Sequence, residues 1–238
     1  MWKSWVVSAA LLMSSASVFA EGGVSFSRNR MVLNEGEKAI SISAYNHGEK
    51  TYLLQAGVSA KPDQVVKAPF VVTPPLGRLN PNGTNVLRII GSGSKLPRDR
   101  ESVFYFHATT IPAKDVENNE KNTEGAVGAQ LSVAMKVVFK LFYRPKGLPI
   151  TITQAQSMMS FVQQGKEIVI KNPTPYHQSF ALLKLDGVEK ELSSSQSMVV
   201  PMGEVRIPVD RKVANITWSL MNDYGGMTPE VTQPVVKE

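Results

Sequence analysis

The chain has 238 residues, a formal net charge of +6 at pH 7 and no cysteine. This length allows one large domain or two domains of ~100 residues each. The absence of cysteine excludes disulfides, thiol redox chemistry and cysteine-based metal sites, so a hydrophobic core has to hold the fold together. The positive charge identifies no partner by itself, because the sequence contains no dense run of Lys and Arg.

The first twenty residues have the pattern of a secretory signal peptide. Lys3 gives a positive start, an apolar segment runs from Val6 to Met13, and Val18-Phe19-Ala20 resembles a cleavage site. The apolar segment is shorter than the ~20 residues that a permanent membrane helix needs. We therefore expect residues 1–20 to be a cleaved signal peptide and the mature protein to be periplasmic, without membrane insertion. Export also argues against nucleic acid as a partner.

Beyond residue 20, short apolar runs alternate with clusters of Gly, Pro, Asn and Asp. Residues 38–45 end at an Asn-His-Gly turn, and residues 85–90 end at Gly-Ser-Gly. Apolar and polar residues that alternate between turns at ~8–12-residue spacing are typical of β-sandwiches. The sequence contains no long amphipathic helix pattern. It therefore predicts an all-β fold.

A domain boundary is predicted at residues 144–149, Arg-Pro-Lys-Gly-Leu-Pro. Two prolines and a glycine within six residues are incompatible with a central strand. We expect an N-terminal domain over residues 21–145 and a C-terminal domain over residues 146–238, each of a size that suits an immunoglobulin-like sandwich. Residues 112–128 are polar and lack apolar periodicity, which predicts a mobile loop.

Residues 131–140 follow this loop and have the alternation of a β-strand. The apolar positions of this row are Leu131, Val133, Met135, Val137 and Phe139. Two interpretations fit the pattern. The row faces the protein's own core, as in an ordinary half-buried strand, or the strand lies at a sheet edge and offers the row to another protein. Periodicity alone favours the first interpretation and does not separate the two.

Several segments resemble, in chain order, the motifs of periplasmic pilus chaperones of the chaperone–usher pathway. These segments are residues 73–79, 96–106, 140–145, 171–176 and 222–226. They span both expected domains, and their common order makes the resemblance specific. The resemblance implies two immunoglobulin-like β-sandwich domains at an angle with a cleft between them. It also implies a protein that is not an enzyme and needs no cofactor or metal.

The family's function, carried over by this resemblance, is donor-strand complementation. A pilus subunit is an immunoglobulin-like fold without its final strand, and the chaperone lends it one. The resemblance implies that residues 131–140 are this donor strand, with Leu131, Val133 and Met135 filling the subunit's pockets and Val137 as a weaker candidate. The implied partners are pilus subunits and the outer-membrane usher. Whether the free protein forms a self-capping homodimer stays open.

The resemblance also assigns roles to several charged residues. It implies that Arg30 and Lys140 anchor the terminal carboxylate of the subunit, because two cations form charge-assisted hydrogen bonds that fix the strand register. Arg28, two residues earlier, is the alternative to Arg30. Without the resemblance these cations would be read as ordinary solvated charges.

A second charged group is implied at the domain junction. By resemblance, Glu101, Arg144 and Asp223 form a buried network between the domains that fixes the interdomain angle and hence the cleft. Such a network adds little net stability, yet removing one partner is costly because the others stay buried and unpaired.

Two other classes of function compete with this hypothesis. For an enzyme, His47, His107 and His177 are scattered without zinc-site spacing, and no serine lies in a G-x-S-x-G motif. An exported immunoglobulin-like adhesin or pilus structural protein is the stronger alternative, since it uses the same sandwich. Such a protein needs neither the paired cations nor the interdomain network.

Overall fold

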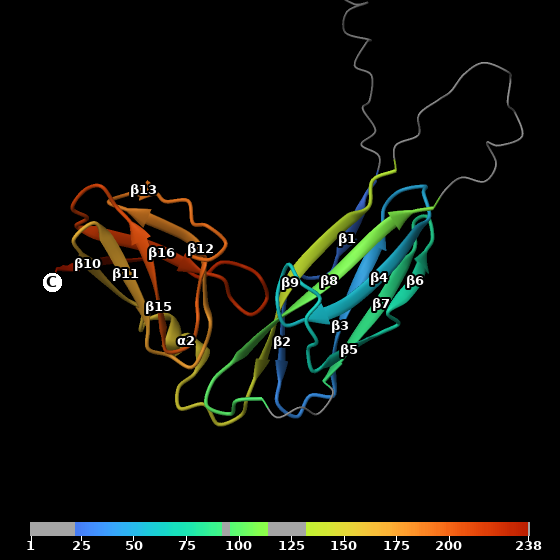
Figure 1. Cartoon of the computed structure of the whole chain (residues 1–238), viewed down its shortest axis with the longest axis horizontal. Coiled ribbons are helices and arrows are strands. Elements are labelled where there is room, and N and C mark those ends of the chain that lie inside the picture. Colours follow the sequence, from blue (N-terminus) through green and yellow to red (C-terminus); the bar gives the residue numbers. More distant parts are fainter. Residues whose placement is uncertain (1–21, 92–95, 114–131, 238) are drawn as a thin grey trace, which may run out of the picture.

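The computed structural model describes residues 22–91, 96–113 and 132–237, which form two β-sandwich domains (Figure 1). The first domain contains β1 (Val24–Phe26), β2 (Arg30–Asn34), β3 (Ala39–Asn46), β4 (Tyr52–Ser59), β5 (Phe70–Thr73), β6 (Leu76–Leu79), β7 (Thr84–Gly91), β8 (Ser102–Pro112) and β9 (Met135–Arg144). The second contains α2 (Ile152–Gln156), β10 (Ser160–Gln164), β11 (Glu167–Asn172), β12 (Gln178–Leu185), β13 (Val188–Glu189), β14 (Met198–Val199), β15 (Gly203–Pro208), β16 (Asn215–Leu220), β17 (Val231–Pro234) and β18 (Val236–Lys237). The predicted all-β fold is confirmed.

The first domain packs sheet β1-β3-β7-β5 against sheet β2-β9-β8-β4-β6. All neighbouring strands are antiparallel except β2 and β9, which are parallel. Alternation along each strand builds the core, as in β7, where Leu87 and Ile89 are buried while Val86 is exposed. Met31 and Phe106, both fully buried, contribute from the facing sheet.

The second domain packs sheet β15-β11-β10-β18 against sheet β13-β12-β16-β17, with β14 beside β12. Its core centres on Trp218, whose ring centroid lies 4.8 Å from that of Phe161. The short helix α2 begins with a capping box, in which the Thr151 side chain accepts from the Gln154 backbone N–H. In the part of the chain that the structure describes, no helix is long and apolar enough to cross a membrane.

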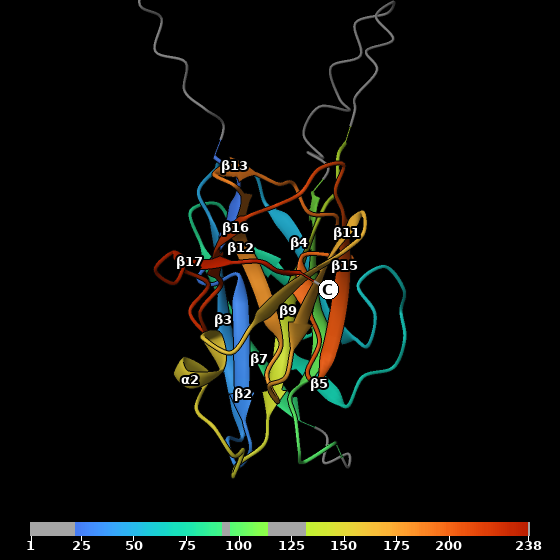
Figure 2. The same cartoon turned by 90° about the vertical axis from the view of Figure 1, so that its left-hand side faces the viewer.

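Residues 145–151 lie between β9 and α2 and connect the two domains, which lie side by side with β9 on the side of the second domain (Figures 1 and 2). The turn at residues 222–226 extends from the second domain toward the first (Figure 1). The first domain therefore contributes β2 and β9 to the contact between the domains, and the second domain contributes β12 and this turn.

The strand predicted over residues 131–140 differs from the observed β9, which runs from Met135 to Arg144. Its neighbour β8 ends at Pro112, and the last paired residues are Thr110 and Met135. Residues 132–134 therefore have no ladder partner among the described residues, whereas pairing with β2 extends the strand to Arg144. Leu131 lies outside the described residues.

The predicted loop at residues 112–128 also needs a correction at its start. Pro112 is still the last residue of β8. Proline has no backbone N–H, and the end of a strand tolerates this missing donor. The rest of that loop from residue 114 onward lies outside the described residues, as does the expected signal peptide at residues 1–20.

Candidate functional site

Part of β9 has a free edge. On one side β9 pairs with β8 over residues 135–143, and on the other side β2 pairs only with residues 140–144. Within the described ranges, no strand pairs with residues 135–139 on that second side. An edge of this kind presents unpaired backbone N–H and C=O groups, which makes it a template for another strand.

The apolar row of β9 divides between solvent and the protein's own core. Val133 and Met135 are 61% and 62% exposed, Val137 and Phe139 pack half-buried against the core of the first domain, and Leu141 is fully buried. Val137 and Phe139 thus face the protein's own core, whereas the side chains of Val133 and Met135 are open to solvent. Met135 lies on the free edge of β9, and Val133 precedes the strand.

Arg30 and Lys140 lie directly opposite each other where β2 begins to pair with β9. Paired residues of neighbouring strands point to the same face, and this face looks toward the second domain. Arg30 is 5% exposed, donates from Nη1 to the Ser179 Oγ of β12 at 3.2 Å, and lies 4.0 Å above the Phe142 ring. Arg28, the alternative, is exposed and precedes β2.

The two neighbouring cations have no anionic partner in the described part of the chain. No carboxylate oxygen there lies within 4.0 Å of either side chain. Burial lowers the pKa of Arg30, and burial followed by the charge of Arg30 lowers the pKa of Lys140. The Nε of Arg30 is also buried without a hydrogen-bond acceptor. This arrangement favours binding of an anion from outside the chain.

Replacing Lys140 by methionine is expected to change how stability depends on pH. Because the folded state lowers the pKa of Lys140, the unfolded chain binds more protons near that pKa, and wild-type stability rises as pH increases toward the usual lysine value. The Lys140→Met variant lacks this gain. The free energy of unfolding of the variant relative to wild type should therefore fall between neutral and alkaline buffer, as measured by urea unfolding across pH. If the free energies of unfolding of the variant and of wild type differed by the same amount at every pH, the burial of an unpaired charge at Lys140 would be contradicted.

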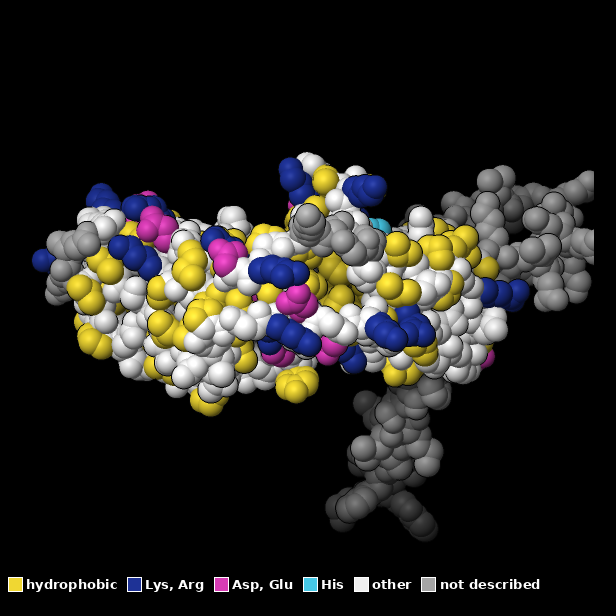
Figure 3. Space-filling view, turned by 90° about the horizontal axis from the view of Figure 1, so that it is seen from below, with side chains coloured by type: hydrophobic (Ala, Val, Ile, Leu, Met, Phe, Trp, Pro, Cys, Tyr) yellow, Lys and Arg dark blue, Asp and Glu magenta, His cyan; other side chains and the backbone are white. Residues whose placement is uncertain are grey.

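Arg144, at the end of β9, binds two carboxylates, Glu101 of the first domain and Asp223 of the second. Its Nη1 and Nη2 donate to the two oxygens of Asp223 at 2.6 and 2.7 Å, and its Nε donates to Glu101 at 2.7 Å. Burial opposes the charge of Arg144, but Asp223 and Glu101 outweigh it and raise its pKa. The structure thus brings together the three residues of the predicted network. Seen from below, charged side chains of both signs gather over the middle of the molecule (Figure 3).

Glu101 also ties the network to the second domain through the backbone. Its side chain is fully buried, and its Oε2 accepts the backbone N–H of His177 at 2.9 Å. The His177 ring lies 5.4 Å from the Phe142 ring, which in turn lies under Arg30. His177, Phe142 and Ser179 were not identified from the sequence. Phe142 lies within a motif segment, whereas His177 and Ser179 carry no local signal of their position.

A pocket of about 350 Å³ opens between the domains beside the free edge of β9. We call it the cleft pocket; its lining residues are Phe26, Ser27, Arg28, Asn29, Phe139, Tyr224, Gly225 and Gly226. The phenylalanine rings of Phe26 and Phe139 meet edge to face at 5.5 Å. The pocket therefore combines an aromatic wall from the first domain with a glycine-containing turn from the second.

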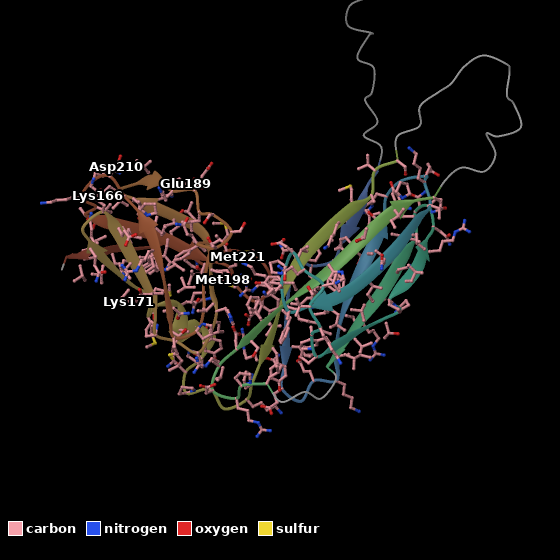
Figure 4. All side chains as sticks on the ribbon, viewed as in Figure 1. Lys166, Lys171, Glu189, Met198, Asp210 and Met221 are labelled. Carbon is pink, nitrogen blue, oxygen red and sulfur yellow. The ribbon has the colours of Figure 1, made fainter. Side chains whose placement is uncertain are left out.

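A larger pocket of about 540 Å³ lies at the far end of the second domain, where Lys166, Glu189 and Asp210 are found (Figure 4). Met198 and Met221, in contrast, lie at the end of that domain that faces the first (Figure 4). The larger pocket is remote from β9 and from the paired cations. In the described ranges, no group of three or more His, Asp and Glu residues could hold a metal ion.

Comparisons with known proteins match the chain over nearly its whole length. The family model of the pili and flagellar-assembly chaperone PapD N-terminal domain matches residues 23–149, and that of the PapD C-terminal domain matches residues 154–232. The probable fimbrial chaperone protein ElfD of Escherichia coli O157:H7 is 34% identical over 227 residues, covering 93% of this chain and 92% of the relative.

Two further similarities cover comparable lengths. The chaperone protein FimC of Escherichia coli O6:H1 is 34% identical over 231 residues, covering 94% of this chain and 90% of FimC. The crystal structure of the periplasmic chaperone SfaE superposes with a TM-score of 0.71 at 30% identity, covering 90% of this chain and 100% of SfaE. Each similarity extends over both domains.

Proposed function

Because this chain belongs to the family of pilus-assembly chaperones, we propose that it binds pilus subunits by lending them β9 and hands them to the outer-membrane usher. Members of this family are chaperones and not enzymes. The free subunit exposes unpaired backbone groups and an apolar groove, which cost several kcal/mol and promote aggregation. A lent strand covers both until the subunit is assembled into the pilus. The periplasm is the proposed location, reached after removal of residues 1–20.

The observation that carries this proposal is the junction between the free edge of β9 and the start of β2. A subunit strand added parallel to β9 along residues 135–139 would lie in line with β2 and end just before Arg30. Its terminal carboxylate would then meet the unpaired charges of Arg30 and Lys140. An antiparallel strand could not place its carboxyl terminus there. The cations therefore select both the direction and the register of the added strand.

The exposed part of the apolar row supplies the side chains for the subunit's groove in this proposal. Val133 and Met135 are exposed and would enter the groove, whereas Val137 is shared with the core of the first domain. Leu131 stays a prediction from the sequence. The Glu101–Arg144–Asp223 network is proposed to hold the second domain at the angle that keeps Arg30 beside Ser179 and the cleft open.

Replacing Met135 by lysine is expected to reduce subunit retention at least tenfold, because a charge would enter an apolar groove. The thermal midpoint of the monomer, measured at a concentration too low for self-association, should stay at the wild-type value, since Met135 is 62% exposed in the free protein. Val138→Lys is the matched control: Val138 lies on the same strand but on the opposite face and is 40% exposed. If both variants lost subunit retention equally, as measured by co-purification, the proposal that Met135 enters the subunit's groove would be contradicted.

The proposed function is tested by tagging the protein and expressing it with the pilus subunits of its own host. A small protein with an incomplete sandwich should co-purify from the periplasm. If no such protein co-purifies, the chaperone role fails, and binding of the purified protein to host-cell surfaces would then support the adhesin alternative.

We also propose that the free protein forms a self-capping homodimer, in which two copies pair their free β9 edges about a two-fold axis. The exposed edge and the 61–62% exposed side chains of Val133 and Met135 support this proposal. Sedimentation should show a dimer that dissociates when subunit is added and that Met135→Lys weakens. A concentration-independent monomer would contradict it.

A further inference from the structure

Three methionines form a row across the second domain, one on each side of Ser179 and one beyond. Ser179 of β12 pairs with Met198 of β14, and on its other side the Met221 N–H donates to the Ser179 carbonyl at 2.8 Å. Met221 in turn forms an isolated antiparallel bridge with Met227. Residues that lie opposite each other on neighbouring strands point to the same face, so all three methionines share the face of Ser179. We call Met198, Met221 and Met227 the methionine row.

The methionine row lies beside the paired cations. The Ser179 hydroxyl accepts from Arg30 at 3.2 Å, so the face of the row looks onto the start of β2. Figure 4 shows Met198 and Met221 at the end of the second domain that faces the first. Opposite residues on adjacent strands have Cβ atoms ~4.5–5.5 Å apart, a distance that a methionine side chain spans. An atom bound to the sulfur of Met198 or Met221 therefore comes within reach of the Arg30 guanidinium.

The sulfurs of the row are open to oxidants. Met227 is 58% exposed, and Met198 and Met221 are half-buried, whereas Met31 and Met159 lie in the cores of the two domains. A thioether is oxidised to a sulfoxide when the oxidant reaches the sulfur, and the packed core shields it. The methionine row can therefore be oxidised while the protein stays folded.

The neighbouring charges distinguish between two chemistries of thioethers. Thioethers also bind Cu(I), but Arg30 and Lys140, which have no carboxylate partner among the described residues, would repel a metal cation. A sulfoxide has no net charge, and its polar oxygen accepts hydrogen bonds better than the weakly accepting thioether sulfur. Within the described ranges the buried Nε of Arg30 has no acceptor, so it is a donor for such an oxygen. The site thus favours oxidation over metal binding.

We propose that the methionine row is an oxidation site, at which hydrogen peroxide forms methionine sulfoxide and thereby weakens subunit capture. The peroxide transfers one oxygen atom to the sulfur: its O–O bond breaks, an S–O bond forms, the sulfur loses two electrons and the peroxide is reduced to water. The sulfoxide oxygen accepts a hydrogen bond from Arg30 and competes with the carboxylate of the subunit. The effect on capture rests on the proposed chaperone function, whereas the oxidation itself does not.

The test exposes the mature protein to hydrogen peroxide and compares each variant with its own untreated sample. All samples carry Met135→Leu, so that oxidation of the donor strand does not contribute. Peptide mass spectrometry measures sulfoxide at each methionine, and titration with purified pilus subunit measures affinity. We expect sulfoxide in the methionine row but not at Met31 or Met159. Affinity should fall about tenfold, as from one competing hydrogen bond to a charged group, and methionine sulfoxide reductase should restore it.

The triple variant Met198→Leu/Met221→Leu/Met227→Leu should keep its affinity in peroxide, because leucine has a similar volume and no sulfur. Met158→Leu/Met202→Leu is the matched control, since both of these methionines are exposed but lie outside the row. It should lose affinity like the parent protein. An equal loss in the triple variant, or no sulfoxide in the row, would overturn the oxidation site while the chaperone function stands.

Met221→Gln is a second test that needs no oxidant. Its amide oxygen is an acceptor like that of a sulfoxide, so subunit affinity should fall about tenfold, whereas Met158→Gln should have no effect. Unchanged affinity in Met221→Gln would contradict the competition for Arg30. If the untreated parent bound no subunit, the chaperone function and the effect on capture would both be refuted, and the mass spectra would still decide whether the row is oxidised.

Discussion

Replacing Arg144 by alanine is expected to lower the free energy of unfolding by about 3–5 kcal/mol. The side chain of Glu101 is fully buried and that of Asp223 is 27% exposed, so two carboxylates that are mostly removed from water would lose their ion-pair partner. Subunit binding should fall as a consequence, because the second domain would lose its fixed position beside β9. Urea unfolding, followed by tryptophan fluorescence of Trp218, measures the effect.

Arg206→Ala is the matched control for this experiment. Arg206 also pairs with two carboxylates, Glu167 at 3.2 Å and Glu204 at 3.0 Å, but its side chain is 49% exposed. Exposed pairs of this kind contribute about 0–1 kcal/mol, so its loss should be small. If Arg144→Ala kept wild-type stability and yet lost subunit binding, Arg144 would be a binding residue and the proposed structural role of the network would be wrong.

Replacing Lys140 by methionine is expected to weaken subunit binding about 10- to 100-fold, because a charged hydrogen bond contributes roughly 1.5–3 kcal/mol. Stability at neutral pH should equal or exceed that of wild type. Lys140 is partly buried beside Arg30, and methionine keeps the apolar stem while removing the repulsion. Binding of purified subunit and the thermal midpoint are the two measurements. A gain or no change in stability together with lost binding is typical of a residue kept for function.

Lys136→Met is the control for Lys140→Met. Lys136 lies on the same face of β9, four residues earlier and exposed, opposite Thr109 of β8. It is remote from the start of β2 and should bind subunit like wild type. If both lysine variants lost binding equally, general charge attraction to the subunit would explain the result and the specific carboxylate anchor would be refuted. If Lys140→Met bound normally, the anchor would also be misplaced.

The sequence by itself determined the class of fold and the family. Period-two alternation between turn residues is a local property, so the strands near residues 38–45 and 85–90 appear as β3 and β7 with each end shifted by one residue. The motif segments are equally local, and they indicated the family without knowledge of any contact. Export of the chain was likewise predicted from the first twenty residues alone.

Only the tertiary structure decided how the apolar row of β9 is divided. Val133 and Phe139 have the same parity in the sequence, yet one is exposed and the other packs against the core. The difference depends on where β8 ends and where β2 begins, and these ends are set by strands distant in sequence. Periodicity identifies a face of a strand, but it carries no information on which neighbour covers that face.

The same reason explains the paired cations and the cleft pocket. Arg28 and Arg30 have the same parity, so alternation cannot choose between them; only the start of β2 places Arg30 opposite Lys140. Ser179, which accepts a hydrogen bond from Arg30, is 149 residues away in the chain, and Tyr224 lines the pocket next to Asp223, which pairs with the distant Arg144. Local patterns specify strands, whereas the junction between two domains is specified by contacts between distant residues that no local pattern encodes.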